Sequence, residues 1–165
     1  MMNPTFAPST RQSERSSDVQ SDEDDLSAWS YKKKRLNLKR STAERLLREI
    51  TERARAINRR SDLPLRISRM VVFGSYVNSQ KERLGDLDMM VWLDKVGDQA
   101  IHASLRQDRI NLRDSISPFR TIFQRYAWPE LEMFQMLRGR SVGLSIHTDA
   151  EEDLLKPGEF IQIDL

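Results

Sequence analysis

The chain of 165 residues has no cysteine and only two histidines, His102 and His147. The absence of cysteine excludes a disulfide framework, a thiolate metal site and a cysteine nucleophile. Two histidines are too few for a zinc site built from several imidazoles. A cytoplasmic protein is therefore the expected class.

Long apolar runs are also missing. Hydrophobic residues make up 38% of the chain and charged residues 32%. No run approaches the ~18 apolar residues that a membrane helix needs. The first residues, MMNPTFAPSTRQSERSS, lack the apolar core of a secretory signal. We therefore expect no membrane-spanning segment and no signal peptide.

Charge is spread unevenly, although the net charge is only +2. Residues 1–30 have a net charge of −4, residues 31–70 of +10, and residues 71–165 of −4. The basic block suits contact with a nucleic acid through residues 32–60. A solvated helix face followed by a linker explains the same charges equally well.

The length predicts one domain with a tail. Residues 1–30 are poor in large apolar side chains and rich in Ser, Asp and Gln. Such a segment buries too little surface to offset its ordering entropy. We expect residues 1–39 to form a disordered tail, acidic and then basic, and residues 40–165 to form the domain.

The clearest helix pattern starts at Ser41 and ends near Arg60. Ser41 and Glu44 match a capping box, in which each side chain satisfies the other residue's backbone N–H. Pro64 pushes the preceding residue out of helical geometry. One helical face is apolar: Ala43, Leu46, Leu47, Ile50, Ala54 and Ile57.

Two nearly continuous apolar segments, 66–74 and 86–94, predict buried central strands. Their connector is too long for a tight hairpin and has room for one short helix. This order predicts an α/β (α+β) fold with a small mixed β-sheet flanked by helices. Weaker patterns predict a helix over 98–112, a helix that begins with Pro129, a strand over 141–147 and an edge strand over 159–165.

Asp86 and Asp88 begin the second of these strands. Alternate residues of a strand point to the same face, so these carboxylates lie about 6.5 Å apart. Two adjacent carboxylates repel each other unless cations lie between them, and their oxygens suit Mg²⁺. A polar turn with two exposed acids is the alternative interpretation.

Gly74 and Ser75 follow the first strand. Glycine lets the backbone approach a ligand closely. Ser75 would begin a short helix, whose free N–H groups attract phosphate. Lys81 and Arg83 on the connector suit further phosphate contacts, although solvated surface charges are an equally good interpretation.

The segment VFGSYVNSQKERLGDLDMMV resembles the nucleotidyltransferase fold superfamily, the DNA-polymerase-β-like enzymes, and small bacterial "minimal" nucleotidyltransferases in particular. The family pattern is an apolar residue, Gly, Gly or Ser, nine to thirteen residues, then Asp, apolar, Asp or Glu, apolar. The segment fills each slot with Phe73, Gly74, Ser75, Asp86, Leu87, Asp88 and Met89.

The resemblance implies magnesium-dependent transfer of a nucleoside monophosphate, AMP from ATP, to a hydroxyl. The acceptor would be a protein, an RNA or a small molecule, and some small relatives are partners of toxins. In this interpretation Asp86 and Asp88 bind Mg²⁺ and catalyse, while Gly74, Ser75, Lys81 and Arg83 hold the triphosphate.

The family also has a third carboxylate on a neighbouring strand, and here the pattern fails. No acid lies inside SVGLSIH. His147 is a candidate base or ligand, and Asp149 a displaced third acid. A histidine without a role and an acid that caps the next helix are the alternatives. The missing acid also suits an inactive or slow nucleotidyltransferase fold that acts by binding a partner.

Overall fold

The structure is a computed structural model that describes residues 37–165. It confirms the predicted mixed α/β class. The prediction of a disordered tail concerns mainly residues 1–36, which lie outside the described residues. Elements occur in the order β1 (Leu38–Lys39), α2 (Arg40–Asn58), β2 (Leu65–Phe73), α3 (Ser75–Asn78), β3 (Arg83–Leu84), β4 (Leu87–Lys95), α4 (Gln99–Ile116), α5 (Ile122–Arg138), β5 (Leu144–Thr148), the 3₁₀ helix η1 (Asp149–Leu154) and β6 (Phe160–Gln162).

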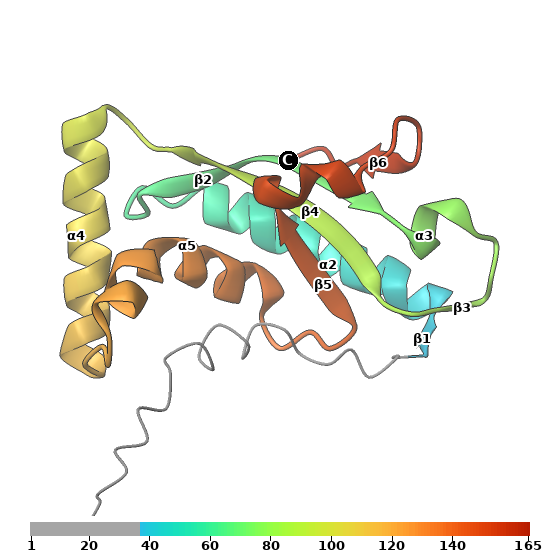
Figure 1. Cartoon of the computed structure of the whole chain (residues 1–165), viewed down its shortest axis with the longest axis horizontal. Helices are drawn as coiled ribbons and strands as arrows, with labels where there is room; N and C mark the ends of the chain where they lie inside the picture. The colour runs from blue at the N-terminus through green and yellow to red at the C-terminus, as the bar shows by residue number, and fades with distance from the viewer. Residues whose placement is uncertain (1–36) are drawn as a thin grey trace, which may run out of the picture. The chain divides into compact units, whose positions relative to one another are not determined.

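The main sheet has four strands in the order β5-β4-β2-β6. β4 is antiparallel to β2 and parallel to β5, and β6 is antiparallel to β2 (Figure 1). The predicted central strands are therefore the two inner ones. β1 and β3 form a separate two-stranded ribbon, so Leu38 and Lys39 already belong to the folded part.

One face of this sheet forms the main core. Figure 1 shows α2 running behind the sheet with α5 alongside. Each large side chain buried there stabilises the fold by about 1.5–3 kcal/mol relative to its exposed state. The core brings together Ala43, Leu46 and Ile50 of α2, Met133 and Leu137 of α5, and Met70, Val72, Leu87, Met89 and Leu144 of the sheet.

The opposite face has a much smaller apolar cluster of Val71, Phe73 and Met90. Partly buried Trp92, Leu155 and Phe160 pack against it. In Figure 1, η1 lies in front of β4, on the side away from α2. This second face also carries the side chain of Asp88, because Asp88 and Met90 are two residues apart on β4.

The predicted capping box of the first helix is wrong. α2 begins at Arg40, and its N-cap Lys39 makes no side-chain cap hydrogen bond. The reason is that β1 runs directly into the helix, and the Arg40 N–H donates to the carbonyl of Glu82 at 2.9 Å. The ribbon thus satisfies a backbone group that a capping side chain would otherwise bind.

The predicted start of the later helix at Pro129 is also wrong. α5 begins at Ile122, and the Thr121 hydroxyl accepts a hydrogen bond from the Gln124 N–H at 3.1 Å. Pro129 lies inside α5, where it lacks the N–H that would bind the Arg125 carbonyl. The cap at Thr121 and the burial of Pro129 outweigh that loss.

α4 starts where the sequence predicts, with the Asp98 carboxylate accepting from the Ile101 N–H, but it extends to Ile116. The two predicted C-terminal strands are present with shorter bounds, as β5 and β6. Within residues 37–165, no helix combines the length and apolarity needed to cross a membrane.

Candidate active site

The turn at Gly74 lies directly against the carboxylate of Asp88. β2 ends at Phe73, which pairs with Asp88 across the sheet. Gly74 has φ +70°, and a Cβ built on it would lie 2.8 Å from Oδ2 of Asp88. Only glycine fits this position without displacing the carboxylate. The two parts of the motif, separated along the chain by the connector, thus meet in space.

Asp86 and Asp88 enter β4 on either side of Leu87. Leu87 is fully buried in the main core, so both carboxylates lie on the opposite face. The Ser145 hydroxyl donates to Oδ2 of Asp86 at 2.6 Å. Ser145 is also the register partner of Asp88 in the parallel β4–β5 pair. β5 therefore holds the acid pair from one side.

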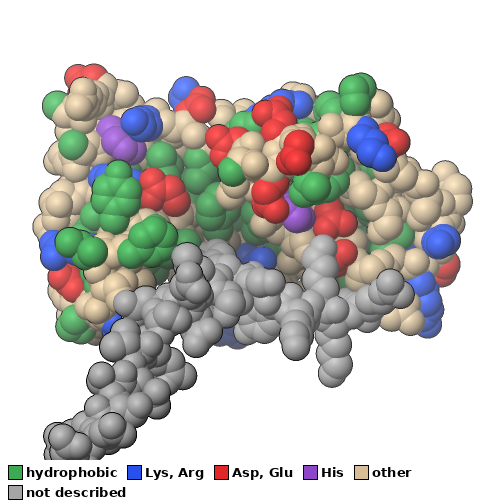
Figure 2. All heavy atoms as spheres, in the orientation of Figure 1, with side chains coloured by type: hydrophobic (Ala, Val, Ile, Leu, Met, Phe, Trp, Pro, Cys, Tyr) green, Lys and Arg blue, Asp and Glu red, His purple; other side chains and the backbone are tan. Residues whose placement is uncertain are grey.

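His147, the candidate base or ligand, lies on β5 beside Asp88. Its Nε2 lies 3.6 Å from Oδ1 of Asp88, and its Nδ1 lies 3.1 Å from Oε2 of Glu151. The imidazole also packs edge-on against the Phe73 ring, with centroids 5.3 Å apart. Figure 2 shows acidic side chains gathered around a histidine on this face.

Asp149, the other candidate for the third acid, is not part of this group. β5 ends at Thr148, and Asp149 is the exposed first residue of η1, whose N-cap is Thr148. The alternation of side chains along β5 therefore does not extend to Asp149. Glu151 contacts His147 instead. Sequence reasoning missed Glu151 because its position depends on where the strand ends and the 3₁₀ helix begins.

The predicted phosphate-binding residues lie around the connector. Ser75 is the first residue of α3, immediately after Gly74, and is partly buried. Lys81 and Arg83 are exposed, and the backbone of Arg83 pairs with Lys39 in the β1–β3 ribbon. Gly74, Ser75, Asp86 and Asp88 thus lie together at the ends of β2 and β4, while Lys81 and Arg83 lie on the loop that joins them.

Arg40 holds this connector in place. Its guanidinium donates to the carbonyls of Tyr76 (3.1 Å), Ser79 and Lys81 (3.2 Å). It also lies over the Tyr76 ring, 5.5 Å from the centroid. One side chain at the start of α2 therefore fixes the loop that runs from α3 to Asp86.

Replacing Arg40 by Met is expected to loosen the connector without unfolding the domain. Hydrogen bonds to a charged group contribute about 1.5–3 kcal/mol each. We expect amide hydrogen exchange over residues 75–82 to accelerate at least tenfold, about 1.4 kcal/mol. Arg48→Met, at an exposed position on the same helix, is the matched control. Equal exchange in both variants would contradict the role of Arg40.

The Asp88 carboxylate raises the pKa of His147 above its ordinary value of about 6.5. Burial opposes this shift, and Glu151 adds to it. A raised folded-state pKa means that the ion pair stabilises the fold fully below the unfolded-state pKa. This stabilisation disappears as the pH rises through the folded-state pKa.

We therefore expect His147→Gln to lose more unfolding free energy near pH 6 than near pH 8.5, in urea titrations at each pH. In an Asp88→Asn background this pH dependence shrinks, because the largest cause of the shift is gone. A His147→Gln loss that is equal at both pH values would contradict the ion pair.

The two carboxylates and the neighbouring histidine do not make a complete metal cage. Within residues 37–165, no group of three or more His, Asp or Glu side chains has the arrangement of a complete metal cage. Mg²⁺, however, is usually bound by one or two carboxylates together with substrate phosphates and water. The pair Asp86 and Asp88 fits that mode of binding.

Comparisons with protein-family models, curated proteins and solved structures find no match to this chain.

Proposed function

We propose that the protein is a magnesium-dependent nucleotidyltransferase that transfers AMP from ATP to a hydroxyl. The observation that carries this proposal is the contact of Gly74 with Asp88, with Asp86 on the same face. It sets a glycine turn, suited to the close approach of a phosphate chain, beside two carboxylates suited to Mg²⁺. A solubilising surface turn requires no such contact.

Asp86 and Asp88 would hold the metal, with nucleotide phosphates completing its shell. Bound Mg²⁺ supplies charge neutralisation at the oxygens that attack and leave. The Gly74–Ser75 turn orients the triphosphate against these carboxylates. Ser145 keeps Asp86 in position through its 2.6 Å hydrogen bond. The connector fixed by Arg40 brings Lys81 and Arg83 to the outer phosphates.

In the reaction, the acceptor hydroxyl oxygen forms a bond to the α-phosphorus of ATP. The bond from this phosphorus to the bridging oxygen breaks, and pyrophosphate leaves. The hydroxyl proton passes to a base. His147, which adjoins Asp88, is the candidate in its neutral form, and this form is populated as the pH rises through the raised pKa of the imidazole. Glu151, at 3.1 Å from Nδ1, fixes the ring orientation.

The acceptor in this proposal carries a free hydroxyl on a protein, an RNA or a small molecule. By analogy with small relatives of the family, a toxin-like partner protein is one such acceptor. The proposal includes a cytoplasmic location, where ATP and Mg²⁺ are available.

Label transfer tests the proposal. Purified protein, Mg²⁺ and each α-labelled nucleoside triphosphate are incubated with a lysate of the native host, and the protein, RNA and small-molecule fractions are separated. We expect label from ATP in one fraction, and none with Asp86→Asn/Asp88→Asn or with EDTA. No label in any fraction, from folded wild-type protein, would overturn the proposed activity.

A binding module with the same fold is the second candidate. The observation that favours it is His147, which takes the third position and pairs with Asp88 itself. In that case the site holds a nucleotide or a partner without turnover. Nucleotide binding without label transfer is the result that distinguishes it from the enzyme.

A further inference from the structure

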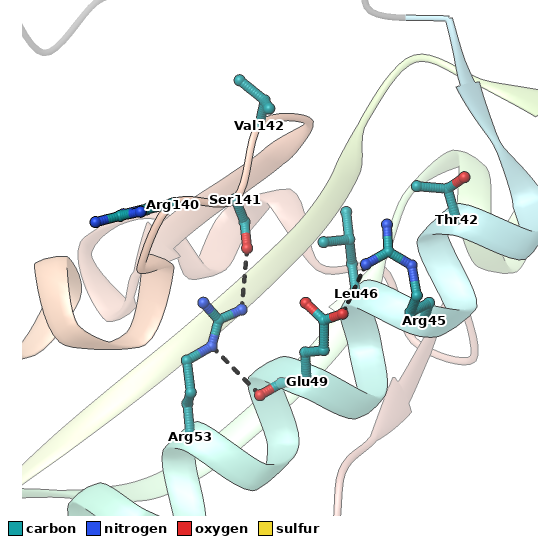
Figure 3. Close-up of a pocket in the computed structure, with 8 residues that line it drawn as sticks. All are labelled: Thr42, Arg45, Leu46, Glu49, Arg53, Arg140, Ser141 and Val142. Atoms are coloured by element: carbon teal, nitrogen blue, oxygen red, sulfur yellow. Dashed lines mark hydrogen bonds and ion pairs between the residues drawn. The ribbon is translucent and has the colours of Figure 1, made fainter.

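A groove of about 320 Å³ lies between α2 and the loop before β5, outside the acid pair. Figure 3 shows side chains from both elements lining this groove. Of the eight lining residues, three are arginines and one is acidic. They are Thr42, Arg45, Leu46, Glu49, Arg53, Arg140, Ser141 and Val142.

Arg53 builds the groove by joining α2 to this loop. Its guanidinium donates to the Arg138 carbonyl at 2.9 Å and to the Ser141 hydroxyl at 3.0 Å. A Cβ on Gly139 would lie 2.2 Å from Nη1 of Arg53, so the loop makes room for this arginine. The Ser141 hydroxyl accepts from Arg53 and keeps its own proton to donate to a ligand.

The charge in the groove is positive. Glu49 is paired with Arg45 at 2.7 Å. Among the described residues, neither Arg53 nor Arg140 has an ion pair with a carboxylate. Thr42 lies in the first turn of α2, and this turn contains no acidic residue. The positive end of a long helix and two uncompensated arginines favour a phosphate-bearing ligand.

The loop that lines the groove continues directly to the acid pair. The Gly143 carbonyl accepts from the Leu87 N–H at 2.8 Å, and Ser145 binds Asp86. Ser141 in the groove is four residues before Ser145, at most ~13 Å of extended chain. Asp86 lies on the face of the sheet away from α2, so a chain-like anion bound in the groove reaches the acid pair by passing around the edge strand β5.

We propose that this groove binds the phosphate backbone of a nucleic acid. The lining residues include no aromatic side chain, so the groove contacts phosphates and does not stack bases. Its recognition is consequently independent of sequence and sensitive to salt. If the proposed transferase activity holds, on which this last step rests, the bound strand supplies the acceptor hydroxyl, and the acceptor class is RNA or DNA.

Fluorescence anisotropy of the full chain with a short labelled RNA, and with DNA of the same sequence, tests the groove. Titrations run without nucleoside triphosphate from about 50 to about 200 mM KCl. We expect Arg53→Gln/Arg140→Gln, which removes the two arginines that have no carboxylate partner among the described residues, to bind at least tenfold more weakly than wild type at low salt. The slope of log affinity against log salt falls by about 1.4 for two lost contacts to a single strand.

Arg66→Gln/Arg120→Gln, at two exposed arginines outside the groove, is the matched control and retains wild-type affinity. Tighter binding of RNA or of DNA identifies which source of phosphate is used. No salt-dependent binding by wild type would overturn the proposal. The proposal would also be overturned if the groove variant bound with wild-type affinity. It would be overturned as well if affinity fell only in a variant with Lys32–Arg35 replaced.

The experiment is independent of the proposed catalysis. Asp86→Asn/Asp88→Asn is expected to bind the strand at least as tightly as wild type, because it removes negative charge near the groove. Strand binding without label transfer would support the proposed groove and contradict the proposed transferase activity. Label transfer to a protein without strand binding would support the transferase activity and contradict the groove.

Discussion

Asp88→Asn is expected to lower the rate of AMP transfer about a thousandfold, a loss of about 4 kcal/mol in transition-state stabilisation. The amide keeps the size of the side chain but lacks the charge that, in the proposed mechanism, would bind Mg²⁺. It also ends the ion pair with His147. Initial rates of label transfer at saturating ATP and Mg²⁺ measure this effect.

Asp94→Asn is the matched control, because Asp94 is an exposed acid at the other end of the same strand. It is expected to transfer label at the wild-type rate. Circular dichroism checks that both variants are folded. A rate for Asp88→Asn within tenfold of wild type would contradict a catalytic role for Asp88.

Gly74→Ala is expected to reduce both stability and activity. Gly74 combines φ +70° with ψ −144°, a region open essentially to glycine alone. Such a strained residue costs about 1–3 kcal/mol. In addition, the new methyl group would lie 2.8 Å from Oδ2 of Asp88 and displace that carboxylate. Urea unfolding measures the stability, and label transfer measures the damage to the site.

Gly85→Ala separates this effect from a general loss of glycine flexibility. A Cβ on Gly85 meets no atom within 4 Å, although Gly85 also lies beside the acid pair. We expect this variant to keep its stability within about 1 kcal/mol of wild type. Equal losses in the two variants would contradict the close contact between Gly74 and Asp88.

The strands that hold the site could be predicted because their signals are local. Apolar runs ending at Gly74 and following Asp86 identify β2 and β4, and the alternation of residues assigns Leu87 to the core and the two acids to the other face. The long connector excludes a tight hairpin. These features depend on steric and hydrophobic properties of adjacent residues.

Other features depend on contacts between distant segments and could not be predicted. α2 begins at Arg40 because β1, just before it, pairs with β3. The Arg40 N–H then binds the carbonyl of Glu82, next to β3. The pairing of His147 with Glu151 depends on the bend where β5 becomes η1. The groove exists because Arg53 reaches across to Ser141, 88 residues further along the chain. No periodic pattern in the sequence encodes these contacts.

Pyrophosphate release is the measurement that tests the central claim most directly. Transfer of AMP releases one pyrophosphate for each nucleotide added, whereas hydrolysis of the γ-phosphate releases inorganic phosphate. With Mg²⁺, ATP and the accepting fraction, the account predicts equal amounts of pyrophosphate and transferred AMP from wild type, and neither from Asp86→Asn/Asp88→Asn. Inorganic phosphate without pyrophosphate, or release that persists in the double variant, would contradict it.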